Sequence, residues 1–185
     1  MGRGIVALPQ SKILRRRALL MILVLFGTSK YEFVRPLIVL NDLAEMGLIK
    51  DRIIVQGSST KFSSKHFKIT PYFQPEELDR LIDEADLIIA HGGTGSVLPA
   101  VKKGKKVIAV ARYGNLNEHS DNHQVELLDA LSAKGYIIPW YIDTKIVDIL
   151  KSIESFKPAT YISTKHFILN FLNHYIKESL VHDKN

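Results

Sequence analysis

A glycine-rich loop carries the residues best suited to binding chemistry. The loop consists of His91, Gly92, Gly93, Thr94, Gly95 and Ser96. It follows the buried apolar run 86–90 and leads straight into a helical pattern, so it joins a strand to a helix. Glycine lets the backbone approach a ligand closely, and the free amides at a helix start bind phosphate. The loop therefore predicts a phosphate-binding turn, with a tight turn capped by Thr94 and Ser96 as the alternative.

Two familiar nucleotide motifs do not match this loop. No Gly-Lys-Ser/Thr follows at the spacing of a Walker loop, and position 98 lacks the third glycine of the dinucleotide fingerprint.

A polar segment further along the chain is the second candidate. It contains Glu118, His119, Ser120, Asp121, Asn122, His123 and Gln124, with Asp121 as the expected N-cap of a helix. His119 and His123 are four residues apart, but no third ligand has the spacing of a zinc site, so we expect no metal. Hydrogen bonds from His123 and Gln124 to sugar hydroxyls or phosphate are the favoured interpretation. Capping and solvated polar side chains are the alternative.

Alternating strands and helices must position both segments. We expect strands at 21–26, 52–56, 67–70, 86–90, 106–110 and 136–138, and helices at 33–46, 75–85, 96–103, 121–134, 143–156 and 163–179. This order predicts an α/β fold with a Rossmann-like, doubly wound and largely parallel sheet. Ligands bind such sheets at the carboxyl ends of the strands, where both polar segments fall.

Length and composition agree with one domain. The chain has 185 residues, no cysteine and a formal charge of +6, which excludes disulfide scaffolds and cysteine chemistry and favours an anionic partner. The basic clusters at 15–17 and 102–106 are either solvated surface or attract phosphate or a membrane. The apolar run 18–26 is shorter than the roughly 18 residues of a membrane span and is better explained as a buried strand than as a signal peptide. We expect residues 1–20 to be a disordered or interfacial tail, with Met21 as a plausible start, and residues 21–185 to be the domain.

Three segments, taken in order, resemble one protein family. They are the glycine loop continued by Val97, the stretch Gly104-Lys-Lys-Val-Ile-Ala-Val110, and the segment 118–124, with Gly27 and Thr28 after the first strand matching as well. Together they resemble the C-terminal domain of glycosyltransferase family 28, and they look most like the small subunits of its two-subunit members. The likeness runs from about Met21 to the last helix.

The resemblance implies the donor-binding half of a GT-B glycosyltransferase. Such a subunit would bind a UDP-sugar, UDP-GlcNAc first among the candidates, without a metal or other cofactor. The glycine loop would hold the diphosphate, and His123 and Gln124 would contact the donor sugar. Catalysis by inversion on a lipid-linked acceptor would need a membrane-bound partner that supplies the acceptor domain and the general base. The chain would then be cytoplasmic and recruited to the cytoplasmic face of a membrane through that partner.

One position departs from the family pattern. The family commonly has a glutamate that binds the ribose hydroxyls where this chain has Pro99. Glu118 or a backbone group is the candidate to take that role.

The end of the chain predicts a surface for the partner. An apolar stripe at helical spacing consists of Phe167, Ile168, Phe171, Leu172, Tyr175 and Ile176. Because the final helix of GT-B enzymes crosses to the other domain, we expect this stripe to contact the partner, with packing on the parent sheet as the alternative.

Two other functions compete with the transferase. A nucleotide-sugar-binding or regulatory module without catalysis would suit the proline at position 99. A basic nucleic-acid-binding domain would suit the charge, but no basic stripe with interleaved aromatic residues is present, so we expect no nucleic-acid partner.

Overall fold

The computed structural model describes residues 21–58, 60–165 and 169–172, so the predicted tail at 1–20 lies outside the described residues. Its centre is a six-stranded sheet in the order β3-β2-β1-β4-β5-β6, with every neighbouring pair parallel. The strands are β1 (Met21–Leu25), β2 (Arg52–Gln56), β3 (Ile69–Thr70), β4 (Leu87–His91), β5 (Val107–Val110) and β6 (Ile138–Trp140). The prediction of a doubly wound parallel sheet is confirmed.

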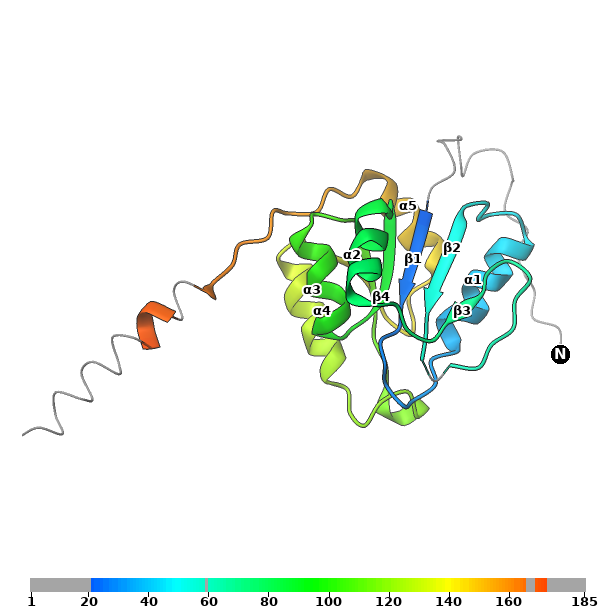
Figure 1. The fold of residues 1–185 in the computed structure, drawn as a ribbon, viewed down its shortest axis with the longest axis horizontal. Helices are drawn as coiled ribbons and strands as arrows, with labels where there is room; N and C mark the ends of the chain where they lie inside the picture. Colours follow the sequence, from blue (N-terminus) through cyan, green and yellow to red (C-terminus); the bar gives the residue numbers. More distant parts are fainter. Residues whose placement is uncertain (1–20, 59, 166–168, 173–185) are drawn as a thin grey trace, which may run out of the picture.

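Helices cover both faces of this sheet (Figure 1). The helices are α1 (Arg35–Glu45), α2 (Pro75–Glu84), α3 (Thr94–Lys102), α4 (His123–Ala133) and α5 (Ile146–Ser155), with a short 3-10 turn η1 at Gly114–Leu116. One core cluster joins the sheet to α1 and α5, and the other joins it to α2, α3 and α4. Strands such as β1 and β5 are therefore buried on both faces, which explains their unbroken apolar sequences.

Several predicted boundaries are wrong by two or three residues, among them the strand expected at 67–70, which is β3 at Ile69–Thr70, and the helix expected at 143–156, which is α5 at Ile146–Ser155. The last strand is β6 at 138–140 instead of 136–138, because Gly135 ends α4 with φ +70° and the Tyr136 amide bonds back to Leu131. Pro139 is tolerated there because β6 is an edge strand. The helix expected at 121–134 begins at His123, and the one expected at 33–46 begins at Arg35 with a proline in its first turn.

The lysines after α3 stabilise helix ends on the edge away from the glycine loop. Lys106 immediately precedes β5 and donates to the carbonyls of Ile153 and Glu154 at the end of α5, at 2.7 and 2.9 Å. Lys105 donates to the carbonyls of Asp83 and Ala85 at the end of α2. A cation at a helix C-terminus offsets the helix dipole. These two lysines are therefore structural and do not face the ligand edge.

Within the described ranges, no helix has the length and apolar character needed to cross a bilayer.

Candidate functional site

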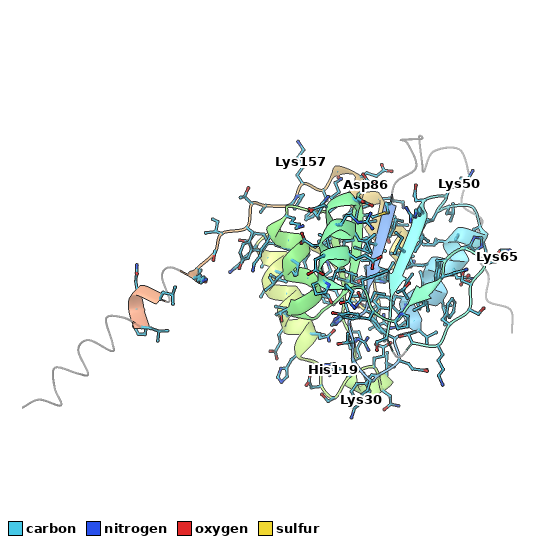
Figure 2. All side chains as sticks on the ribbon, in the orientation of Figure 1. Lys30, Lys50, Lys65, Asp86, His119 and Lys157 are labelled. Atoms are coloured by element: carbon cyan, nitrogen blue, oxygen red, sulfur yellow. The ribbon has the colours of Figure 1, made fainter. Side chains whose placement is uncertain are left out.

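The topological switch point of the sheet lies between β1 and β4. From there the chain leaves β1 toward one side and β4 toward the other, and in sheets of this kind the ligand-binding crevice lies at the carboxyl edge of such a point. Gly27 follows β1, and Gly92 and Gly93 follow β4, so the predicted glycine turns lie next to each other in space. Figure 2 shows that Lys30, after β1, and His119, after β5, also lie at this end of the molecule, with Asp86 at the opposite end.

His91 fills the space between the two glycine turns. A Cβ atom on Gly27 would lie 2.6 Å from His91 Nε2, and a Cβ atom on Gly93 would overlap the same ring. Gly27 also has φ +67°, a conformation that side chains disfavour. Both glycines are therefore required by the imidazole, whether or not a ligand binds there.

Burial lowers the pKa of His91 to about 4, and the nearby positive charge of Arg112 contributes to the shift. The ring is consequently neutral at physiological pH. Its Nδ1 atom is buried and has no hydrogen-bond partner among the described residues.

The start of α3 presents unused amides. The amides of Ser96 and Val97 both donate to the Gly93 carbonyl at 3.0 Å. Among the described residues, nothing accepts a hydrogen bond from the amides of Thr94 and Gly95, and no side chain caps the helix. The space around Gly95 is open, because a Cβ atom there would meet nothing within 4 Å. Free amides in open space at a helix N-terminus can bind an anion.

Gln124 connects the glycine loop to the next strand. It is 8% exposed, and its Oε1 accepts the Arg112 amide at 3.2 Å, while Gly92 packs against Gln124 and Leu128. The contact between Gln124 and the donor sugar remains a prediction.

The two histidines of the polar segment differ in surroundings. His119 lies 6.2 Å from the Tyr31 ring, and its Nδ1 is 3.1 Å from Asp121 Oδ1. The His123 side chain is 78% exposed, with Nδ1 3.4 Å from Glu126. Thr28, the remaining predicted residue, is exposed on the loop after β1. In the parts of the chain that the structure describes, no three His, Cys, Asp or Glu side chains form a metal-binding group.

Glu118 joins the loop after β5 to the start of α1. Its carboxylate accepts two hydrogen bonds from the Arg35 guanidinium, each at 3.0 Å, and a third from the Tyr113 amide at 3.2 Å. Glu118 is also buried. Because these bonds already use the Glu118 carboxylate, a backbone group is the better candidate to bind the ribose hydroxyls in place of the glutamate that the family commonly has at position 99. Pro99 has no N–H to give to the Gly95 carbonyl four residues earlier, so that carbonyl lacks its helical donor.

Arg35 and Arg112 were missed by the sequence analysis. Arg112 is 1% exposed and donates to three backbone carbonyls around the site, and Arg35 pairs with Glu118. A signal was present in the sequence, because a charged residue two positions after the buried strand β5 needs a partner nearby.

The fold and the crevice define a class of protein. A glycotransferase of kitacinnamycin is similar in structure over 83% of this chain and 38% of its own, with TM-score 0.54 and 15% identity. An NMR structure of ALG13 is similar over 78% of this chain and 90% of its own, with TM-score 0.50 and 18% identity. The chain has the Rossmann-like fold of one half of a GT-B glycosyltransferase.

Sequence comparison identifies the family. The glycosyltransferase family 28 C-terminal domain matches residues 19–177, and the chain belongs to this family. A UDP-N-acetylglucosamine transferase subunit ALG13 from Yarrowia lipolytica is 28% identical over 137 residues, which is 69% of this chain and 67% of that protein. The protein of the same description from Mus musculus is 29% identical over 118 residues, 60% of this chain. The matched region spans only 10% of the mouse protein's length.

Proposed function

We propose that this chain is the donor-binding subunit of an inverting glycosyltransferase that uses UDP-GlcNAc. The observation that carries the proposal is the pair of free amides, on Thr94 and Gly95, at the switch point of the sheet. Membership of glycosyltransferase family 28 supports it, as does the similarity to UDP-N-acetylglucosamine transferase subunits.

The amides would act on the leaving group. An acceptor hydroxyl attacks the anomeric carbon, the bond from that carbon to the UDP oxygen breaks, and UDP leaves with the bonding electrons. Backbone amides that are already oriented toward the diphosphate stabilise the charge that develops on it. The proton of the acceptor hydroxyl goes to a general base, which we expect from the partner.

We expect donor binding to be independent of metal. Calorimetry with UDP, UDP-GlcNAc and a single-stranded RNA, each with and without EDTA, tests this. UDP and UDP-GlcNAc should each bind as tightly with EDTA as without it, and the RNA should not compete with them for the site. Binding that disappears with EDTA and returns with Mn²⁺ would contradict the metal-free site. Preferential binding of RNA would contradict the transferase itself.

A membrane-bound partner carrying the acceptor site, and a lipid-linked sugar as acceptor, complete the proposal. The chain would then work at the cytoplasmic face of a membrane, recruited there through that partner. Purification of the native chain from membranes, followed by identification of the proteins that accompany it, tests this part. Full transferase activity by the isolated chain would refute the need for a partner.

A further inference from the structure

A buried arginine joins two loops beneath the candidate site. Arg112 follows β5, and its guanidinium donates to the carbonyls of Phe26 at 2.9 Å, Tyr31 at 3.0 Å and Glu118 at 3.0 Å. Phe26 directly precedes the Gly27 turn, and Glu118 begins the polar segment. One side chain therefore sets the relative positions of the loops that follow β1 and β5.

The charge of this guanidinium is not balanced by its immediate neighbours. Its three acceptors are neutral carbonyls, and the Glu118 carboxylate is bound by Arg35. Two guanidinium groups and one carboxylate leave one positive charge among these three side chains. Although burial lowers the pKa of Arg112 to about 10, the group remains protonated at neutral pH.

Such an arrangement is costly unless an anion offsets it. A buried charge loses its hydration, and carbonyl dipoles replace only part of it. The Phe33 ring, 4.4 Å from the guanidinium carbon, adds a cation–π contact. Nε remains without a partner among the described residues. The local charge thus favours a negatively charged ligand at the neighbouring crevice.

The positive charge lies close to the glycine turns. The Arg112 amide donates to Gln124, which packs against Gly92. The charge also contributes to the lowered pKa of His91, the ring between Gly27 and Gly93. Its field therefore reaches the crevice where the free amides of Thr94 and Gly95 lie.

We infer that Arg112 is a positioning residue for the anionic part of the donor, a nucleoside diphosphate, and that its charge favours this group without touching it. The inference rests on the proposed function. It assigns two roles to one side chain: holding the two loops that follow β1 and β5, and adding positive potential beneath the glycine turns.

Replacing Arg112 distinguishes the effect of its charge from its structural role in holding the loops. Arg112→Met removes the charge, and Arg52→Met is the matched control, since Arg52 is exposed at the amino end of β2 on the opposite edge of the sheet. In Arg112→Met we expect UDP affinity to fall about tenfold while uridine affinity changes less than about twofold, because only UDP carries the diphosphate charge. Equal losses for UDP and uridine would mean that Arg112 acts through structure alone and would overturn the inference.

A second measurement does not depend on any ligand. NMR titration of His91 should show a higher pKa in Arg112→Met than in the wild type or Arg52→Met, since a nearby positive charge disfavours imidazolium. An unchanged His91 pKa in the folded variant would overturn the inference even if the wild type bound no nucleotide. A wild type that binds neither UDP nor UDP-GlcNAc would instead refute the proposed function.

Arg112→Lys covers the case in which the methionine variant does not fold. Lysine keeps the charge but lacks the planar fork that reaches three carbonyls. We expect its ratio of UDP to uridine affinity to stay within about twofold of the wild type, because the Coulomb contribution is retained. A folded lysine variant that loses this ratio would overturn the inference.

Discussion

At the scale of single residues, His91 is the most constrained group of the candidate site. It lies between two glycine turns, its Nδ1 lacks a partner among the described residues, and burial together with Arg112 lowers its pKa to about 4. Protonation must therefore place a second positive charge beside Arg112 in a buried space. Protonating His91 therefore costs more free energy in the folded state than in the unfolded chain.

Stability should fall on acidification because of this histidine. The unfolded chain binds a proton near pH 6.5 and the folded chain only near pH 4, so stability is full above pH 6.5 and decreases as the pH falls toward 4. Within that window the loss approaches about 1.4 kcal/mol per pH unit. Urea unfolding at several pH values, with NMR titration of His91, measures it. A His91 resonance that titrates near pH 6.5 would contradict the prediction.

Two alanine substitutions should distinguish the glycines of the loop. Gly93→Ala places a methyl group into the His91 ring and should destabilise the fold by about 1–3 kcal/mol, as overpacking does. Gly95→Ala faces open space and, at a helical position, should leave stability equal or higher by up to about 1 kcal/mol. Its methyl group should nevertheless weaken UDP binding by blocking close approach to the backbone.

Thermal unfolding and calorimetry of both variants check this pair. Unchanged UDP affinity in Gly95→Ala would mean that the loop is only a turn. Equal stability of the two variants would contradict the packing of His91 against Gly93.

At the scale of secondary structure elements, α3 combines a free amino end with an internal proline. Pro99 removes one helical hydrogen bond and leaves the Gly95 carbonyl without that donor, yet the helix continues to Lys102. Val97 and Val101 are fully buried against the sheet, and this packing offsets the unfavourable propensity.

Replacing Pro99 should separate stability from nucleotide binding. Pro99→Ala restores the N–H and should stabilise the domain by up to about 3 kcal/mol. Pro99→Glu should add a carboxylate acceptor for the ribose hydroxyls, as the family pattern implies, and bind uridine more tightly than the alanine variant does. Denaturant unfolding and uridine titration of both variants test this. Equal uridine affinities would show that the carboxylate does not reach the ribose.

At the scale of the whole molecule, the chain beyond α5 first follows the domain and then leaves it. The Ala159 amide donates to the Gly135 carbonyl at 2.9 Å, and the Tyr161 ring lies 5.6 Å from that of Tyr136. Further on, residues 169–172 lie away from the domain (Figure 1). Phe171 and Leu172 are 62% and 45% exposed, so this part of the predicted apolar stripe does not pack on the sheet. Phe167, Ile168, Tyr175 and Ile176 lie outside the described residues.

A chain that ends at Ile162 should therefore fold and bind donor but lose its partner. All anchoring contacts named above lie at or before Ile162, so thermal stability and UDP affinity should stay close to those of the full chain. Co-purification with the membrane-bound partner, and transferase activity, should be lost. A matched control is the full chain with Phe171→Ser, which should weaken the complex without changing UDP affinity. A shortened chain that still co-purifies and transfers sugar would refute the role of this segment.

The amino-acid sequence by itself determined the order of elements and the edge at which ligands bind. Unbroken apolar runs such as β1 and β5 predict strands buried on two faces, and the alternation with helices predicts parallel pairing. The glycine loop at 91–96 was found for the same reason, because glycines and hydroxyls between a buried strand and a helix are a local pattern. Such features are set by residues that lie close together in the chain, so a single sequence is enough to reveal them.

Only the tertiary structure decided how the site residues are used. Glu118 is held by Arg35, 83 residues earlier in the chain, and Arg112 reaches the carbonyl of Phe26, 86 residues earlier. Gly93 is required by the His91 ring, and Gln124 accepts the backbone amide of Arg112. Hydrogen bonds and close packing between distant segments act over a few ångströms in space, so spacing along the chain does not reveal them.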